Sequence, residues 1–292
     1  MARNIKLLLT TLIFFLFILN TLVLSQQRDA QPVHFEKISE RLYQIMGGSG
    51  AQGGAYIGDN GVLIIDAKMN EESVKQVIEA VRNITDKPIV YLVNTHSDGD
   101  HIRGNKFFPK TITFIAHENC RKEFFISRNN TPSEWENPEL APFVPSITFK
   151  NQMNIHLGGK KVELWYFGIG HTTGDAVVYF PEEKTAFLGD QIFIGRPQLI
   201  HSYKGGNSFA HVKTLSKLLK TLDVEKYCSG HSAIVDRATI EEHILQMKER
   251  QEKVARFIKQ GKNLDEIKNA FEENEARLIS SIFNEIKEGK TK

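Results

Sequence analysis

One short stretch of the chain concentrates side chains that bind metal ions. Residues 95–101 read THSDGDH, which places two imidazoles and two carboxylates within six residues, at His96, Asp98, Asp100 and His101. Imidazole nitrogen and carboxylate oxygen together suit Zn²⁺, Fe or Mn²⁺. A solvated turn in which the aspartates cap a helix has the same composition. The stretch by itself therefore leaves a metal site and a polar turn both open.

Further motifs combine a histidine or an aspartate with neighbouring glycines. His171 lies in GIGHTTGD, 70 residues after His101; Asp190 ends FLGD, 19 residues later; His231 lies in SGHS, another 41 residues on. Asp66 follows an apolar run in the same manner. Polar side chains just past the ends of buried strands commonly form the site of an α/β protein. We expect these motifs to meet in one site.

The complete set resembles the metallo-β-lactamase superfamily, whose signature is THxHxDH, then GHTxG, then GD and a final GH. The match extends over roughly residues 35–240, and order, spacing and flanking glycines agree. The resemblance implies a four-layer αββα sandwich with metals at one edge between the sheets. It also implies two metal sites bridged by Asp190, with His96, Asp98 and His171 in the first and Asp100, His101 and His231 in the second. The resemblance further implies that Asp100 orients the attacking water. Asp66, Thr95 and Thr172 are expected to support the ligands from behind.

Asp98 departs from this signature, which has a histidine at that position. A carboxylate is charged and a harder ligand than imidazole, and three carboxylates with one hydroxide would neutralise two divalent ions. A more neutral centre activates water less strongly. The flavodiiron proteins of the superfamily have a glutamate here and hold iron, but this chain has no flavodoxin-like part. We expect two Zn²⁺ per chain, with Fe or Mn as alternatives, and leave open whether Asp98 is a ligand or the first site is weak or empty.

Hydrophobic spacing predicts the elements that would position these motifs. Strands are predicted at residues 35–45, 62–65, 89–93, 111–116, 162–167, 176–180, 185–188 and 226–228, helices at 70–84, 118–127, 208–222 and 238–288 with a break at Gly261, and a long loop at 128–146. This order indicates a mixed protein of the α+β or α/β class with helices outside the sheets. We predict a metallo-β-lactamase-like domain at residues 26–238 and a helical C-terminal extension at 239–292.

The first 25 residues have the layout of a secretory signal peptide. Arg3 and Lys6 precede an apolar core, and Val23-Leu24-Ser25 offers a cleavage site. We expect cleavage and export to the periplasm or the medium; an uncleaved membrane anchor is the alternative. Removing the segment takes the net charge from +2 to 0. A neutral chain argues against binding nucleic acid, which requires a basic excess.

The remaining composition is ordinary, with 41% hydrophobic and 25% charged residues, and excludes collagen, a disordered chain and a multi-span membrane protein. Two cysteines, Cys120 and Cys228, exclude a disulfide scaffold and a four-cysteine zinc site. In an oxidising compartment they are either separate buried thiols or a pair.

Several other residues have two interpretations each. Arg196 and Lys204 are candidate cations for a substrate carboxylate or phosphate, or belong to a solvated loop. Glycine-rich residues 47–54 form a phosphate cradle or a hairpin at the rim of the site, and Trp135 belongs to a lid or pins its loop to the core. The other histidines are expected at surface or capping positions: His34, His117, His156, His201, His211 and His243.

The resemblance implies an exported metal-dependent hydrolase, in which metal-activated water attacks an ester, thioester, amide (including β-lactam) or phosphoester of a small molecule. A β-lactamase proper ranks below an ester hydrolase, because the superfamily's lactamases generally lack an aspartate at the position of Asp190. A non-catalytic metal- or ligand-binding protein with a degenerate site is the rival from another class. The sequence does not determine the oligomeric state.

Overall fold

Two β-sheets form the centre of the structure, a computed structural model that describes residues 31–291. The predicted signal peptide and its cleavage site lie outside the described residues. The strands are β1 (His34–Lys37), β2 (Leu42–Met46), β3 (Gly53–Ile57), β4 (Val62–Ile65), β5 (Ile89–Asn94), β6 (Thr113–His117), β7 (Ile147–Phe149), β8 (Gln152–Leu157), β9 (Lys160–Trp165), β10 (Val177–Phe180), β11 (Thr185–Phe187) and β12 (Lys226–Cys228).

Helices flank both sheets. The α-helices are α2 (Glu71–Ile84), α3 (Gly99–Ile102), α4 (Glu118–Glu123), α5 (Ser208–Thr221), α6 (Arg237–Lys259), α7 (Leu264–Lys268) and α8 (Ala276–Lys287), and the short 3₁₀ helices are η1 (Arg103–Phe107), η2 (Glu134–Glu136), η3 (Pro138–Phe143), η4 (Ser202–Lys204) and η5 (Glu273–Glu275). Within residues 31–291, no helix combines the length and hydrophobicity that spanning a lipid bilayer requires.

The sheets differ in strand direction. The first runs in the order β1-β2-β3-β4-β5-β6-β7, antiparallel up to β4 and parallel from β4 to β7. The second runs in the order β12-β11-β10-β9-β8, and only its β11–β12 pair is parallel. Carboxyl ends of parallel neighbours lie at the same edge of a sheet. The segment after β4 therefore lies next to the segment after β5. In the same way, the segment after β11 lies next to the segment after β12.

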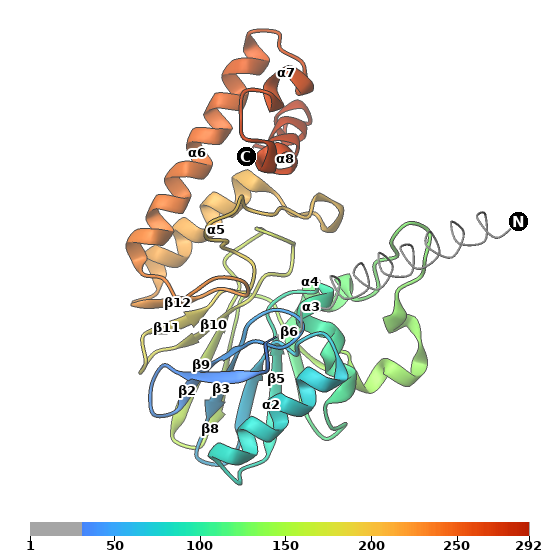
Figure 1. The fold of residues 1–292 in the computed structure, drawn as a ribbon, viewed down its shortest axis with the longest axis vertical. Coiled ribbons are helices and arrows are strands. Elements are labelled where there is room, and N and C mark those ends of the chain that lie inside the picture. Colours follow the sequence, from blue (N-terminus) through green and yellow to red (C-terminus); the bar gives the residue numbers. More distant parts are fainter. Residues whose placement is uncertain (1–30, 292) are drawn as a thin grey trace, which may run out of the picture. The chain divides into compact units, whose positions relative to one another are not determined.

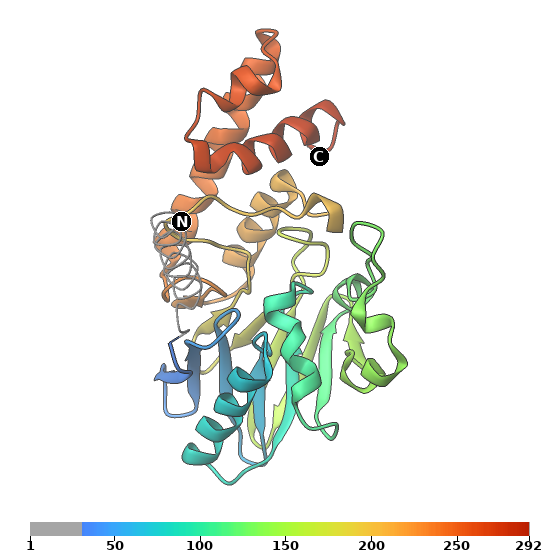
Figure 2. The same ribbon diagram turned by 45° about the vertical axis from the view of Figure 1, so that its right-hand side comes forward.

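Three hydrophobic clusters define four layers. Leu63 and Phe180 belong to the cluster between the sheets, and the buried face of α2, with Val74, packs on the outer face of the first sheet. The third cluster joins the second sheet to α5, α6 and α8, for example through Leu218 and Ile282. Figures 1 and 2 show α2 against the first sheet and α5 between the second sheet and the last helices. The predicted αββα sandwich of mixed α/β class is confirmed.

Local signals set the main helices. Asn70, at the start of α2, accepts a hydrogen bond from the Ser73 backbone N–H, and Asn207 caps α5 through Ala210 in the same way. Both helices begin within one residue of the prediction. The break predicted at Gly261 is also confirmed: α6 ends at Lys259, and Gly261 has φ +78°. The boundary proposed between residues 238 and 239 stays a prediction.

Several elements of the structure are not among those predicted. Strands β3, β7 and β8 are absent from the predicted set; in β8 only Ile155 and Leu157 of its six residues are buried, so its hydrophobic pattern is weak. The segment 128–146, predicted as a loop, contains η2 and η3. Trp135 is 5% exposed, and its ring centroid lies 5.0 Å from that of Phe124, so Trp135 pins this segment to the core.

Both cysteines are unpaired. Cys120 and Cys228 are fully buried and belong to different hydrophobic clusters, on opposite faces of the first sheet. Burial raises the pKa of both thiols, which keeps them protonated. Of the two interpretations, separate buried thiols are confirmed.

Candidate metal centre

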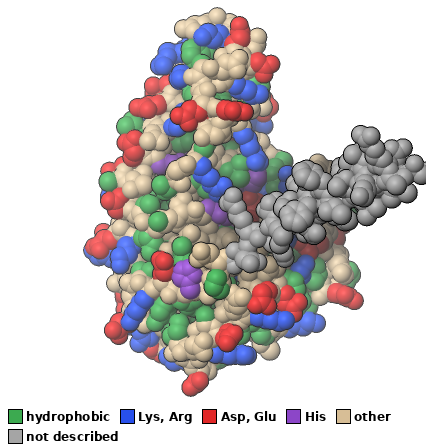
Figure 3. All heavy atoms as spheres, in the orientation of Figure 1, with side chains coloured by type: hydrophobic (Ala, Val, Ile, Leu, Met, Phe, Trp, Pro, Cys, Tyr) green, Lys and Arg blue, Asp and Glu red, His purple; other side chains and the backbone are tan. Residues whose placement is uncertain are grey.

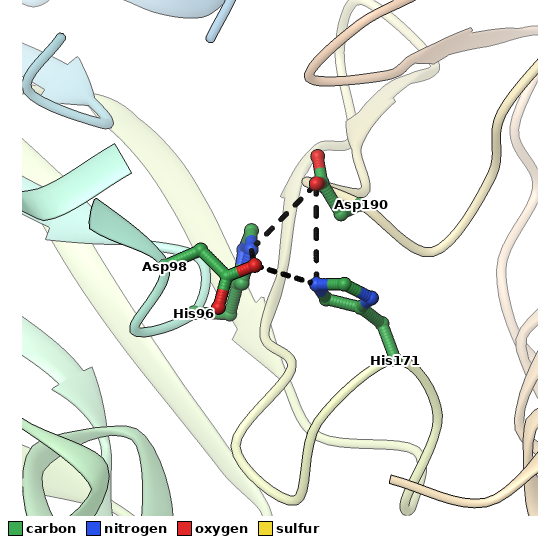
Figure 4. A group of neighbouring side chains, drawn as sticks. All are labelled: His96, Asp98, His171 and Asp190. Carbon is green, nitrogen blue, oxygen red and sulfur yellow. Dashed lines mark hydrogen bonds and ion pairs between the residues drawn. The ribbon is translucent and has the colours of Figure 1, made fainter. Parts of the chain in front are cut away.

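All seven predicted ligands come together in two adjoining groups. The first group contains His96, Asp98, His171 and Asp190, and the second contains Asp100, His101 and His231; within each group the nearest ligand atoms all lie within 4.8 Å of one another. Figure 4 shows the first group, whose side chains converge from three separate loops.

Asp190 contacts both groups. Its Oδ1 lies 3.2 Å from His101 Nε2, and its Oδ2 lies 3.3 Å from His231 Nε2. The same Oδ2 lies 3.8 Å from His96 Nε2 and 3.9 Å from His171 Nε2. Ligands about 2.0–2.1 Å from a tetrahedral Zn²⁺ are roughly 3.3–3.4 Å apart. The spacing around Asp190 is therefore close to that of a carboxylate shared between two ions.

The loop after β5 exposes its carboxylates to the site. Asp98 occupies the N-cap position of α3, with φ −72° and ψ 145°, but its side chain makes no capping hydrogen bond. Asp100 lies in the first turn of the same helix. The polar-turn interpretation, in which the aspartates cap the helix, is thus wrong for Asp98.

Hydrogen bonds fix the ring orientation of the buried histidines. His101 Nδ1 lies 2.8 Å from Asp66 Oδ2, and His171 Nδ1 lies 2.8 Å from the Leu199 carbonyl oxygen. Both partners only accept, so each Nδ1 donates to its partner. The Nε2 of each ring then faces the site and, in the neutral ring, offers it a lone pair.

Thr95 orients the third ring. Its hydroxyl donates to Asp66 Oδ2 at 2.8 Å and lies 3.1 Å from His96 Nδ1, from which it accepts. The Thr95 backbone N–H also donates to Asp66 Oδ1. Thr172, by contrast, donates its backbone N–H and its hydroxyl to Asp175 and in this way shapes the loop that carries His171.

Several ligand atoms of this cluster are buried without a hydrogen-bond partner. They are His96 Nε2, His101 Nε2 and Asp190 Oδ1. Leaving such atoms unpaired costs about 1–3 kcal/mol each. Divalent cations held by the two groups would satisfy all three atoms, so the donor set and its orientation fit metal ions.

The carboxylates make the site favourable for positive charge. Burial opposes protonation of both His171 and His231, yet neighbouring carboxylates raise the pKa of each ring to about 9: Asp98 and Asp190 act on His171, and Asp100 and Asp190 act on His231. Burial alone would raise the pKa of Asp98, but hydrogen bonds from the surrounding imidazoles hold it far below its usual range. The same negative potential would attract a divalent cation.

Lys204 and Arg196 differ from each other in their surroundings. Lys204 is 8% exposed, and its Nζ lies 2.6 Å from Asp98 Oδ1. It is therefore neither in a solvated loop nor available as a substrate cation in this arrangement. Arg196 is exposed and lies 4.0 Å above the ring of Phe193, which stacks on His231.

Some histidines were assigned wrongly. His201, expected at a surface or capping position, is 8% exposed with Nε2 2.7 Å from Asp98 Oδ2. His211 is fully buried, and its Nε2 lies 3.1 Å from that of His243. None of these residues falls in a motif; the one available signal was that His201 follows Asp190 in the same loop as Lys204. His117 does cap α4, as predicted.

The glycine-rich loop lies at the rim of the site. Gly50 has φ +104°, and a Cβ there would come within 2.7 Å of the Asp100 carbonyl oxygen. The Ala51 N–H donates to the same oxygen, while Lys68 Nζ donates to the Gly47 and Ala51 carbonyls. These bonds hold the loop against Asp100 and favour the rim hairpin over a phosphate cradle.

An open groove of about 590 Å³ reaches the ligand loop at Gly99. Arg103, Lys106 and Arg128 line it, together with Glu134, which pairs with the first two. Two positive charges remain in excess there. On the face drawn in Figure 3, exposed charges of both signs are otherwise interspersed; that the chain does not bind nucleic acid stays a prediction.

Comparisons with known proteins agree with this geometry. Residues 54–231 match the family model of the metallo-beta-lactamase superfamily. The chain is 23% identical over 169 residues to a metallo-beta-lactamase type 2 of Elizabethkingia meningoseptica, covering 56% of this chain and 63% of that one. It is 28% identical over 140 residues to the 2,4-dinitroanisole O-demethylase subunit alpha of a Nocardioides strain, covering 47% and 40%. The matches thus span less than two thirds of these relatives.

Solved structures show the same fold. The DIM-1 metallo-beta-lactamase aligns with a TM-score of 0.63 at 18% identity, over 75% of this chain and 99% of that one. The metallo-beta-lactamase of Pontibacter korlensis aligns with a TM-score of 0.62 at 16% identity, over 74% and 99%. At these identities the likeness concerns the fold alone.

Proposed function

The chain belongs to the metallo-beta-lactamase superfamily, and from this membership we propose that it is an exported, dinuclear metal-dependent hydrolase of small molecules. The observation that carries the proposal is Asp190: its Oδ1 faces the second group, its Oδ2 faces both groups, and buried imidazole Nε2 atoms around it have no hydrogen-bond partner. Zn²⁺ suits this mixture of imidazole and carboxylate best, with Fe or Mn as alternatives.

Each group of residues has a distinct task in this mechanism. His96, Asp98 and His171 would hold one ion, Asp100, His101 and His231 the other, and Asp190 both. Bound divalent ions supply a water of lowered pKa and polarise the carbonyl or phosphoryl group of the substrate. Asp66 and Thr95 keep the imidazole lone pairs pointing inward throughout.

Asp100 is the carboxylate best placed to meet substrate and water. Its side chain is 29% exposed, against 12% for Asp98 and 4% for Asp190. It therefore stands at the mouth of the cluster, where its carboxylate accepts a hydrogen bond from the attacking water and orients it. His231, 26% exposed and 3.0 Å from Asp100, lies beside it at the same mouth.

The groove at Gly99 indicates what the substrate carries. The groove has a net positive charge, because its lining contains Arg103, Lys106 and Arg128 against the single carboxylate of Glu134. A substrate whose ester, thioester, amide or phosphoester lies at Asp100 can place an anionic group in this groove. We propose a small carboxylate- or phosphate-bearing substrate on this basis.

β-Lactam hydrolysis is the second candidate, and the relatives' names favour it. Against it stands Asp190, because the superfamily's lactamases generally lack an aspartate there. A non-catalytic binding protein is the candidate from another class.

The test uses the mature chain from Gln26 on, loaded with Zn²⁺, Fe²⁺ or Mn²⁺ and analysed for metal. We expect two ions per chain and turnover in a panel of esters, thioesters, lactones, β-lactams and phosphoesters, each offered with and without a carboxylate. Arg128→Ala should raise KM for the carboxylate-bearing members alone, with Lys160→Ala on a distant hairpin as the control. Two bound ions without turnover of any class would make the chain a binding protein, and selective turnover of β-lactams would reverse our ranking.

A further inference from the structure

Asp98 is held by two side chains from outside its own loop. Lys204 Nζ lies 2.6 Å from Asp98 Oδ1, and His201 Nε2 lies 2.7 Å from Asp98 Oδ2. Both partners come from the segment around η4, more than 100 residues later in the chain. The one position where the chain departs from the superfamily signature is thus the one that this segment contacts.

His201 acts as a hydrogen-bond donor toward Asp98. Its Nδ1 lies 3.2 Å from a terminal nitrogen of Arg277 in α8. A guanidinium group only donates, so His201 Nδ1 accepts and the proton of the neutral ring resides on Nε2. That proton points to Asp98 Oδ2. The last helix therefore fixes the ring state of a residue that contacts the site.

Lys204 brings a buried positive charge to Asp98. Besides Asp98, its Nζ contacts the Ser97 hydroxyl at 2.8 Å. That hydroxyl donates to Glu123, which also accepts from Thr173, so the polar groups around the ammonium are bonded among themselves. An ammonium at 8% exposure requires a nearby carboxylate, and Asp98 is the one in contact.

The contact with Lys204 occupies Asp98 Oδ1 and leaves Asp98 Oδ2 to face the metal site. With Oδ1 on Lys204, Oδ2 accepts from His201 and with its other side faces His171 Nε2 at 3.0 Å and His96 Nε2 at 3.6 Å. A histidine in the signature would present one neutral donor atom here. Asp98 also presents one donor atom, and the charge that it adds is offset by the ammonium beside it.

Given the metal centre proposed above, we propose that Asp98 and Lys204 act as a unit that replaces the imidazole of the superfamily signature, with His201 and Arg277 keeping Asp98 Oδ2 aimed at the first site. Lys204 and His201 are positioning residues in this arrangement. The positive charge of Lys204 offsets the negative charge that Asp98 adds to the site. The metal centre is then no more neutral than one with a histidine at this position, and a weaker activation of water is no longer expected.

The test is a double-variant cycle read by metal binding rather than turnover. Wild type, Lys204→Met, Asp98→His and Asp98→His/Lys204→Met are titrated with Co²⁺ against a chelator, and the visible absorption and the number of ions per chain are recorded. We expect each single variant to weaken the first site by roughly tenfold to 100-fold. The double variant should bind two ions again, because its imidazole has no ammonium beside it.

Lys160→Met is the matched control: Lys160 is partly exposed and pairs with Glu182, and this variant should bind metal like wild type. Thermal unfolding of all variants separates loss of the site from loss of the fold. Full metal binding by Lys204→Met, or by Asp98→His with Lys204 intact, would overturn the unit. If the four variants bind metal as expected but no substrate is turned over, the Asp98–Lys204 unit stands and the hydrolase proposal fails. If substrates are turned over but metal binding does not depend on Lys204, the hydrolase proposal stands and the unit fails.

Discussion

Asp66 Oδ2 lies 2.8 Å from His101 Nδ1, behind the second group of ligands. Asp66 is 4% exposed and has φ +59°, a conformation that few residues other than glycine, asparagine and aspartate adopt. Its two oxygens accept three hydrogen bonds, two of them from Thr95. The carboxylate therefore determines which nitrogen of His101 faces the metals, without touching them.

Replacing Asp66 by asparagine should weaken the second metal site by roughly tenfold to 100-fold. Asparagine tolerates the same backbone conformation, but its amide can donate to His101 Nδ1 and thereby shift the ring proton to Nε2, where the metal binds. Chelator competition measures the affinity, with Asp59→Asn at the surface as the control. An unchanged affinity would show that His101 orients itself without Asp66.

Asp190→Ala should remove more metal and more activity than Asp98→Ala. Asp190 faces both ligand groups, whereas Asp98 contacts only the first. We expect loss of both ions and of at least about 100-fold in kcat for Asp190→Ala, and loss of one ion for Asp98→Ala. The number of bound ions and the turnover rate of both variants, measured beside those of wild type, test this expectation. Full metal content and rate in Asp190→Ala would end the dinuclear mechanism.

The buried His211 and its partly exposed neighbour His243 should make the protein less stable in mild acid. Burial keeps both rings neutral, lowering the pKa of His211 well below its usual value and that of His243 to about 4. In the unfolded chain both titrate near 6.5, so below that pH only the unfolded state takes up these protons. The free energy of unfolding should then fall by up to roughly 1.4 kcal/mol per pH unit for each ring.

His211→Gln should flatten this dependence. Urea unfolding at pH 7, 6 and 5 gives the slope, and subtracting the slope of the variant from that of wild type cancels contributions from the metal site. His156→Gln, at an exposed position of β8, is the control and should keep the wild-type slope. Equal slopes for wild type and His211→Gln would mean that the ring is protonated in the folded state.

Two neighbouring residues of α6 test whether the C-terminal helices pack on the sandwich. Ile244 is 7% exposed within the cluster shared with the second sheet, and Leu245 is 51% exposed. We expect Ile244→Ala to cost roughly 2–5 kcal/mol and Leu245→Ala about 0.5 kcal/mol or less. Chemical denaturation measures both. Equal effects of the two substitutions on the free energy of unfolding would show that α6 does not pack on the core of the sandwich.

The exported protein should begin near Gln26. The charged start, the apolar core and the Val-Leu-Ser end of the first 25 residues are the basis. N-terminal sequencing of protein from the periplasm or medium checks it. Protein that begins at Met1 in the membrane fraction would replace cleavage by anchoring.

The sequence by itself determined the family, the sandwich and the seven candidate ligands. Those residues lie in short motifs next to glycines that their geometry requires; a Cβ on Gly230, for example, would come within 2.5 Å of Asp190 Oδ1. Helices with a clear apolar spacing and an asparagine cap, such as α2, were likewise predictable from local signals.

Only the tertiary structure decided what surrounds Asp98. His201, Lys204 and Arg277 follow no motif, and they reach the site because η4 and α8 pack beside it. Likewise, the buried His211 meets the partly exposed His243 through the packing of α5 on α6. Contacts between residues far apart in the chain, 32 positions for these histidines and 76 or more around Asp98, depend on how whole elements pack, and neither residue type nor local spacing encodes that. The position that departs from the signature could therefore be read from the sequence, while the residues that surround it could not.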